Sequence, residues 1–282
     1  MLICGVVWST TTEPTVEANE GLSIDAPDAG EFTSTLTGLT PATTYYVRAY
    51  ATNEAGTAYG EEFMFTTPVP FTCGDPLTFM YNGSEVTYGT VSFAGRCWLD
   101  RDLGASGVPS YPEDMIGYGD LFQWGREADG HQERTSLSTE TLAPAGQQPG
   151  HNEYIFNFTD TYDWNEDETW IYRWVDEFGL RTAADPCPEG WKVPNETEWA
   201  DALSVGGWVN SNDAFNSPLM ISLGGDRSGF KGVYNEGTSA TYWSSTGFGT
   251  GMASIVYLNP GSVGQANLDV SYGYSIRCIK IE

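Results

Sequence analysis

The chain has 282 residues and a formal net charge of −26, a length that suits two ordinary domains. A field of that sign repels phosphate backbones and anionic lipids, so we expect no nucleic-acid partner. No run of about 18 apolar residues occurs, so no membrane insertion is predicted. Residues 1–5 lack the segments of a secretory signal. A signal would then lie upstream, or export follows another route, or the protein belongs to a virion.

The composition favours short strands and ordered turns. Aromatic residues make up 14% of the chain and there are 33 glycines, which is typical of β-structure with many turns. The five cysteines include no C-x-x-C pair, so zinc ribbons and thioredoxin-like sites are unsupported. Four of them lie in the later part of the chain and could form two disulfides, which favours an oxidising compartment. We therefore expect a mainly β protein that is extracellular or at a cell surface, with a virion surface as the alternative.

Residues 1–67 are predicted to form part of a β-sandwich, with strands at 3–9, 31–36, 44–52 and 57–66. The segment LTPATTY at 39–45 resembles the pattern leading into the penultimate strand of fibronectin type III domains. The resemblance assigns Tyr45 to the tyrosine corner, in which the hydroxyl bonds to nearby backbone. A complete sandwich has about seven strands, and the first two are missing here. Either the sequence is truncated, or a neighbouring chain donates a strand to the edge at 3–9.

A stiff linker, PVP at 68–70, separates this part from a second domain at 71–282. One helix is predicted at 194–204, where Asn195 can cap the first turn. A second is predicted at 167–178, where aromatic residues recur at every fourth position. The rest is expected to be short strands between long glycine-rich loops. The second domain is therefore predicted to be α+β within a mainly β protein.

Six segments of the second domain carry a family resemblance. They are CGDP (73–76), GRCWLDRDL (95–103), GDLFQWG (119–125), CPEGWKVP (187–194), YWSST (242–246) and GYSIRC (273–278). Their order and spacing resemble the Fibrobacter succinogenes major paralogous domain, found in exported proteins of Bacteroidetes and Fibrobacteres. The resemblance implies a C-type-lectin-like fold, related to formylglycine-generating enzymes and to the variable ligand-binding proteins of diversity-generating retroelements. The N-terminal part also resembles repeats that precede such domains in Bacteroidetes surface proteins.

In such a fold, the large side chains and the cysteines of these motifs are expected to have structural roles. The motif tryptophans are expected to pack in the core, with sugar stacking as the alternative. These tryptophans are Trp98, Trp124, Trp191, Trp199 and Trp243. We expect disulfides Cys73–Cys97 and Cys187–Cys278, which would brace the loops. Cys4 is left over and is expected to be a small buried residue.

The sequence offers little catalytic equipment. The histidines are His131 and His151, neither in a G-x-S-x-G or H-E-x-x-H context, so both are expected to be loop residues. Formylglycine-generating enzymes keep a reactive cysteine pair near the C-terminus, where this chain offers only Cys278. No carboxylate pair for glycoside cleavage stands out by its context, although acids are plentiful. We therefore expect no enzyme activity.

The acidic segment 163–169 has the D-x-N-x-D alternation of a calcium loop, with Asp163, Asn165 and Asp167 as the ligands. Glycine at loop position six and glutamate at position twelve are missing, so a true EF-hand is excluded. Two alternatives stay open, a looser structural calcium site and a solvated acidic loop. No other cofactor is expected.

Ligand recognition is expected on the last strands and their loops, residues 247–272, because related variable proteins bind there. The side chains implied are Phe248, Thr250, Met252, Ser254, Gln265, Asn267, Asp269 and Tyr272. Aromatic and methionine side chains give apolar contact, and amides give adaptable hydrogen bonds. The sequence therefore predicts a non-catalytic adhesion protein that recognises a protein or a glycan on a cell surface. Two alternatives stay open: a structural subunit of a filament or virion, and a carbohydrate-active enzyme.

Overall fold

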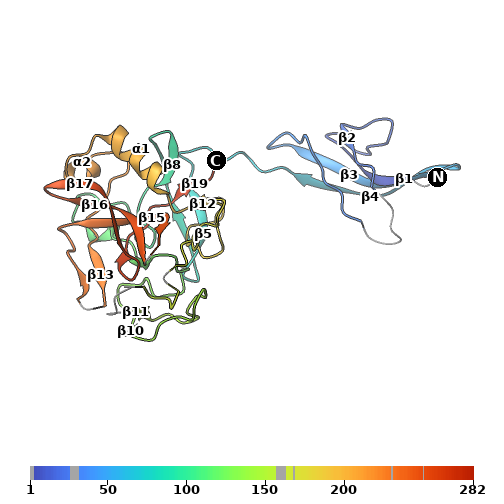
Figure 1. The fold of residues 1–282 in the computed structure, drawn as a ribbon. Coiled ribbons are helices and arrows are strands. Elements are labelled where there is room, and N and C mark those ends of the chain that lie inside the picture. The colour runs from blue at the N-terminus through green and yellow to red at the C-terminus, as the bar shows by residue number, and fades with distance from the viewer. Residues whose placement is uncertain (1–2, 26–31, 157–162, 168, 230, 250) are drawn as a thin grey trace. The chain divides into compact units, whose positions relative to one another are not determined.

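The computed structural model describes residues 3–25, 32–156, 163–167, 169–229, 231–249 and 251–282. The chain forms two compact units, Met1–Thr72 and Cys73–Glu282, in which strands far outnumber helices (Figure 1). The mainly β class predicted from composition is confirmed. Among the described residues, no helix combines the length and the apolar character needed to cross a membrane.

The first unit contains one four-stranded antiparallel sheet in the order β2-β1-β3-β4. Its strands are β1 (Ile3–Ser9), β2 (Gly21–Leu22), β3 (Thr44–Asn53) and β4 (Gly56–Thr66). Three of the four predicted strands are therefore confirmed to within one residue. The strand predicted at 31–36 is wrong for its described residues, 32–36, which belong to no strand. There the Ser34 hydroxyl donates to the Asp25 carboxylate at 2.6 Å, a local polar contact that competes with strand pairing.

The tyrosine corner predicted in this unit is confirmed. Tyr45, at the start of β3, is buried, and its hydroxyl oxygen accepts a hydrogen bond from the Thr40 N–H at 2.9 Å. This bond holds the segment before β3, at Thr40, against the side chain of Tyr45 on β3. Cys4 is buried and forms no disulfide, as the sequence predicts.

β1 is an interior strand of its sheet. One side pairs with β3 over the whole of Ile3–Ser9. The other side pairs with β2, and the Ser23 and Asp25 N–H groups donate to carbonyls of Val6 and Cys4. A donated strand needs an unpaired edge, and at Ile3–Ser9 both sides of β1 already pair within the chain.

The second unit combines small sheets with two short helices. Its sheets have the orders β5-β6, β12-β19-β8-β7, β14-β13-β18-β9, β15-β16-β17 and β10-β11. The elements are β5 (Leu77–Tyr81), β6 (Ser84–Tyr88), β7 (Thr90–Phe93), β8 (Arg96–Leu99), η1 (Met115–Gly117), β9 (Phe122–Gln123), β10 (Ser138–Thr139), β11 (Tyr154–Ile155), β12 (Trp191–Lys192), α1 (Glu196–Gly206), α2 (Ser211–Phe215), β13 (Asp226–Ser228), β14 (Gly232–Tyr234), β15 (Ala240–Phe248), β16 (Met252–Asn259), β17 (Ser262–Asp269), β18 (Gly273–Tyr274) and β19 (Ile279–Lys280).

Helix α1 forms where the sequence predicts it. Asn195 caps the helix with its side chain accepting from the Glu198 N–H, while the Glu198 carboxylate accepts from the Asn195 N–H. This capping box satisfies two backbone donors at the helix start. The helix ends at Gly207, whose φ of 58° is a left-handed conformation that glycine adopts easily.

Aromatic side chains fill the core of the second unit. The five motif tryptophans, Trp98, Trp124, Trp191, Trp199 and Trp243, are each at most 2% exposed. Four of their indole N–H groups donate to backbone carbonyls, those of Phe93, Ser244, Trp243 and Phe122. A buried ring with an engaged N–H cannot stack on a sugar, so the core interpretation of these tryptophans is confirmed and the sugar-stacking alternative is wrong.

The helix predicted at 167–178 is wrong for its described residues, none of which is helical, and Val175 forms an isolated bridge with Arg181. Trp174 is fully buried, whereas Phe178 is 78% exposed, so the aromatic residues do not share a face. Tertiary contacts determine the conformation of this segment. The Trp174 indole donates to the Arg126 carbonyl at 3.0 Å, and the buried Arg173 guanidinium lies 4.7 Å from the Trp164 ring centre.

Both predicted disulfides of the second unit are confirmed. Cys73 pairs with Cys97, and Cys187 pairs with Cys278. The second bond joins the segment before α1 to the last strands of the chain, β18 and β19, across 91 positions of sequence.

Candidate ligand-binding site

The residues predicted to bind a ligand lie mainly on strands of the β15-β16-β17 sheet. Phe248 ends β15, Met252 and Ser254 belong to β16, and Gln265, Asn267 and Asp269 belong to β17, with Tyr272 just beyond it. Thr250 lies outside the described residues. Residues two apart on a strand, and residues directly opposite on neighbouring strands, face the same side of a sheet. The register therefore places the candidates of β15, β16 and β17 on one face of this sheet.

Four of these residues line one hollow of about 300 Å³, together with Ala266 and Glu196. The four are Phe248, Ser254, Gln265 and Asn267; we call the space the β17 hollow. Ser254 is buried and pairs across the sheet with the exposed Asn267. The Gln265 amide donates to the Glu196 carbonyl at 2.8 Å, which ties β17 to the start of α1. The structure thus brings together residues from β15, β16, β17 and a helix.

The other described candidates lie apart from this hollow. Met252 pairs with Asp269 across the sheet, and partial burial raises the pKa of Asp269. Tyr272 stacks on Tyr274 with ring centres 5.8 Å apart. None of the three lines the β17 hollow.

A second hollow of about 380 Å³ lies on the other side of Glu196, and sequence reasoning missed it. Its lining comes from loop 171–179, the start of α1 and the end of β15: Ile171, Tyr172, Val175, Asp176, Glu177, Gly179, Lys192, Asn195, Glu196, Thr197, Ser245, Thr246 and Gly247. We call it the α1 hollow. Loop 171–179 was predicted to be helical, and no local pattern signals that it folds against β15.

Gly247 allows loop 171–179 to lie close to the end of β15. A Cβ atom there would lie 2.5 Å from a ring carbon of Trp124 and 2.9 Å from the Ile171 carbonyl oxygen. A larger residue would therefore push loop 171–179 away from the strand. The hollow depends on this glycine as well as on the residues that line it.

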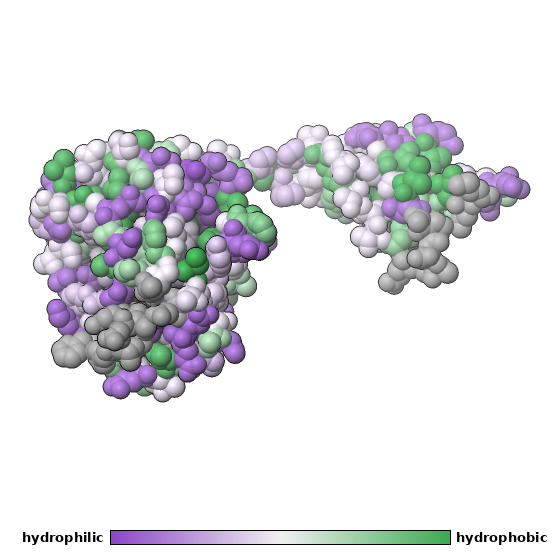
Figure 2. All heavy atoms as spheres, viewed as in Figure 1, coloured by the Kyte–Doolittle hydropathy of each residue, from purple (hydrophilic) through white to green (hydrophobic). Residues whose placement is uncertain are grey.

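On the face of the second unit that Figure 2 shows, hydrophobic residues do not indicate a binding site. In Figure 2 they are scattered among hydrophilic residues over the visible surface of the second unit. Single exposed apolar residues are ordinary on soluble proteins. The two hollows beside α1 are therefore the better guide to a binding surface.

The proposed calcium ligands have other partners. The buried Asp163 carboxylate forms an ion pair with Arg173. The Asn165 side chain bonds to backbone at Gly146, Pro144, Gln147 and Asp167. Among the described residues, no group of three or more His, Cys, Asp and Glu side chains could hold a metal. A guanidinium against Asp163 repels a divalent cation, so these contacts oppose the calcium hypothesis and favour a structural role.

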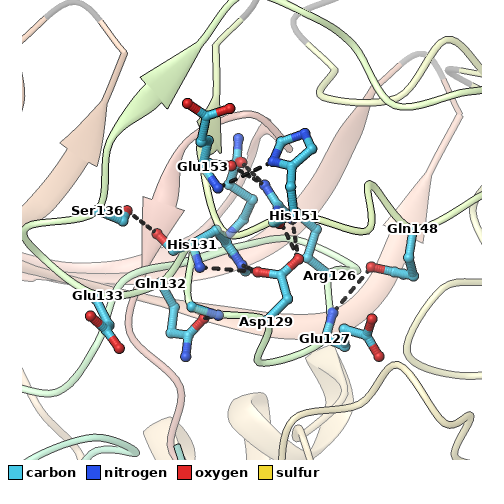
Figure 3. A network of polar contacts seen from close by, with 12 residues as sticks. Arg126, Glu127, Asp129, His131, Gln132, Glu133, Ser136, Gln148, His151 and Glu153 are labelled. Atoms are coloured by element: carbon cyan, nitrogen blue, oxygen red, sulfur yellow. Dashed lines mark hydrogen bonds and ion pairs between the residues drawn. The ribbon is translucent and has the colours of Figure 1, made fainter.

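His131 belongs to a buried network with Asp129 and Arg126 (Figure 3). Its Nδ1 lies 2.6 Å from the Asp129 carboxylate, and its Nε2 accepts from the Gln123 N–H at 3.0 Å. Burial, with repulsion from Arg126, lowers the pKa of His131 to about 4 despite the attraction of Asp129. An Asp-His pair resembles a proton-transfer device, but here both ring nitrogens already have partners. This histidine lies in a turn, as the sequence predicts, and its burial with two bonded ring nitrogens indicates that it holds loops together.

The carboxyl groups of Asp120 and Asp185 have pKa values that are raised to about 6. Burial raises the pKa of Asp120 to about 6, opposed by a hydrogen bond from Tyr81. Burial raises the pKa of Asp185 to about 6 as well, although the Cys187 and Val193 N–H groups donate to it. Neither carboxyl group lines the β17 hollow or the α1 hollow. Cys278 is held in a disulfide and is not a thiolate.

Comparisons with known proteins identify no relative. No family model, no curated protein and no solved structure matches the chain.

Proposed function

We propose that this protein is a non-catalytic binding protein of a cell surface or the extracellular space. It recognises a protein or a glycan through the β17 hollow. In this proposal the second unit is a C-type-lectin-like domain of the Fibrobacter major paralogous kind, and the first is a partial fibronectin type III-like unit. The six motif segments, the tyrosine corner at Tyr45 and the two disulfides support it.

The observation that carries the proposal is the gathering of four predicted ligand residues in one hollow. Phe248, Ser254, Gln265 and Asn267 meet there, although they come from three strands. Beneath them the sheet is rigid, because β15 and β16 bury Tyr242, Trp243, Ile255 and Val256 completely or nearly so. Recognition residues on a rigid scaffold lose little conformational entropy on binding.

The chemistry of the β17 hollow suits recognition. Beside Glu196 and Ala266, its lining includes one aromatic ring, one hydroxyl and two amides, groups that make apolar contact and adaptable hydrogen bonds. Two disulfides are compatible with an oxidising, extracellular location. β1 has no free edge that could accept a strand from a neighbouring chain. No observation favours an enzyme over a binding protein.

The test is a binding screen with the full chain. Fluorescently labelled protein is applied to a glycan microarray and to an array of bacterial surface-protein ectodomains. A Gln265→Ala/Asn267→Ala variant should then bind the ligand found roughly tenfold more weakly, about 1.4 kcal/mol. Asn212→Ala, an exposed amide on α2, is the matched control and should bind normally.

Two results would count against the proposal. Unchanged binding of the double variant, with its fold intact by circular dichroism, would remove the β17 hollow as the site. Release of sugar fragments from the glycan array, abolished by replacing one acid, would show an enzyme instead.

A further inference from the structure

The α1 hollow has the chemistry of a pocket for a positively charged side chain. We propose that it binds a lysine or arginine side chain from a basic segment of a partner protein. This inference rests on the proposed binding function and names the class of its partner. Charge, shape and the state of the α1 N-terminus each support it.

Carboxylate residues form one part of the lining of the hollow. Asp176, Glu177 and Glu196 all line it. Within the part of the chain that the structure describes, the carboxylates of Glu177 and Glu196 have no hydrogen-bonded or ionic partner. The only cation on the lining is Lys192, whose ammonium lies 2.8 Å from the carboxylate of Glu198 and is neutralised by it. The lining therefore carries negative charge that the described residues do not compensate.

The wall of the hollow is apolar. Ile171, Tyr172 and Val175 line it, and Tyr172 is 50% exposed. Lysine and arginine carry an aliphatic stem that packs on such surfaces while the charged head stays among polar groups. A tyrosine ring also attracts a cation over its face. A lining that combines apolar side chains with carboxylates thus matches both parts of a long basic side chain.

The start of α1 does not favour an anion here. A helix N-terminus attracts anions through its unsatisfied N–H groups. In this chain the Glu196 N–H donates to the Thr246 hydroxyl at 3.1 Å, and the Glu198 N–H donates to the Asn195 side chain at 2.8 Å. Two of the first-turn donors are therefore occupied, and the carboxylate of Glu196 adds a negative charge.

Size and net charge favour a protein segment as the source of the cation. A volume of about 380 Å³ is near the lower end for small-molecule pockets, so it suits one long side chain whose backbone stays outside. The net charge of −26 steers a basic partner towards the protein and speeds association. Glu196 lines both hollows, so a segment with its basic residue in the α1 hollow could extend over the β17 hollow.

The experiment uses four capped pentapeptides, Gly-Gly-X-Gly-Gly, in which X is arginine, lysine, citrulline or glutamate. Each is titrated into the full ¹⁵N-labelled chain up to about 10 mM, where millimolar complexes are populated. We expect the arginine and lysine peptides to shift the amide resonances of Val175, Glu196 and Thr197. Citrulline keeps the shape of arginine without its charge and should shift them little, and glutamate not at all.

A variant pair tests the role of the carboxylates. Glu177→Gln/Glu196→Gln should weaken binding of the arginine peptide roughly tenfold, because both uncompensated carboxylates of the lining are lost. Glu85→Gln/Glu189→Gln changes the net charge equally at two exposed positions outside the hollow and should change affinity less than about twofold. Spermidine, a cation with no peptide backbone, is titrated in parallel to separate a small polyamine from a protein segment.

Several outcomes would overturn the inference. They are shifts of these resonances that are equal for citrulline and arginine, no shift with any basic peptide, equal weakening by the two variant pairs, or tighter binding of spermidine than of the peptides. The Gln265→Ala/Asn267→Ala variant leaves the α1 hollow intact. A ligand that depends on those two residues while basic peptides do not bind would retain the proposed function and reject this inference alone.

Discussion

Arg277 and Asp102 form a fully buried ion pair between residues that are 175 positions apart, with Nη2 and Oδ1 2.7 Å from each other. Arg277 also donates to the Leu219 carbonyl at 2.7 Å. The Asp102 carboxylate accepts from the hydroxyls of Tyr242 and Ser222 at 2.7 and 3.2 Å. This network ties the GRCWLDRDL segment to the last segment of the chain, so both motifs serve the scaffold.

Arg277→Met should destabilise the second unit by about 3–5 kcal/mol, because it leaves the Asp102 carboxylate buried without its cation. Guanidinium unfolding followed by tryptophan fluorescence measures this loss. Lys231→Met removes an exposed charge and should change stability by less than about 0.5 kcal/mol. Equal stability of the two variants would contradict the structural role of the pair.

The two disulfides should contribute unequally. Cys187 and Cys278 are 91 positions apart, and Cys73 and Cys97 are 24 apart. Loop-closure entropy predicts about 4–5 kcal/mol for the longer loop and about 3–4 kcal/mol for the shorter one. Thermal unfolding of Cys187→Ala/Cys278→Ala should therefore occur at a lower temperature than that of Cys73→Ala/Cys97→Ala. The reverse order would show that enthalpic terms outweigh chain entropy.

Tyr45→Phe should weaken the sheet of the first unit by about 1 kcal/mol, because the Thr40 N–H loses its acceptor. Native-state hydrogen exchange of the β3 amides in the full chain measures this directly. Tyr46→Phe is the matched control, since no described residue hydrogen-bonds to its hydroxyl. Similar exchange rates in both variants would mean that the tyrosine corner contributes little.

His131 should remain neutral to low pH. Its pKa is lowered from 6.5 to about 4, so between these values the folded state binds fewer protons than the unfolded state. This group's contribution, roughly 3 kcal/mol, is therefore complete above pH 6.5 and is lost as pH falls towards 4. Imidazole ¹⁵N shifts should report a single neutral tautomer down to about pH 5. Titration of this ring near pH 6.5 would contradict the buried network.

The pH dependence of the global free energy of unfolding will not isolate the contribution of His131. The pKa values of Asp120 and Asp185 are raised from 3.8 to about 6, so the folded state binds extra protons between these values. Their contribution to stability falls as pH rises through that range, opposite in sign to that of His131. Site-specific NMR is therefore the decisive measurement for the histidine.

Features coded by neighbouring residues were predictable. Asn195 and Glu198 are three positions apart and form the capping box of α1. Tyr45 finds its partner five positions upstream. The disulfide pairs followed from the motif resemblance. Each of these predictions depends on local geometry or on a recognised pattern, and each is confirmed.

Features that depend on distant partners were not predictable. The aromatic spacing at 167–178 favours a helix, but burial of Arg173 and Trp174 against residues 40 or more positions away holds the segment in turns. The edge predicted at Ile3–Ser9 is covered by residues 20–25, which carry little strand signal. His131 lies in a turn as predicted, but its complete burial and its bonds to Asp129 and Gln123 were not predicted.

The sequence by itself determined the mainly β composition, the cap of α1, the disulfide partners and the aromatic material of the core. The disulfide partners came from the motif resemblance, and the other features depend on side-chain size, on backbone preference and on contacts within a few residues. Only the tertiary structure decided which exposed side chains share a hollow, because Glu196 meets Gln265 from one side and loop 171–179 from the other. Such a surface arises from the packing of strands, helix and loop, and no local periodicity encodes it.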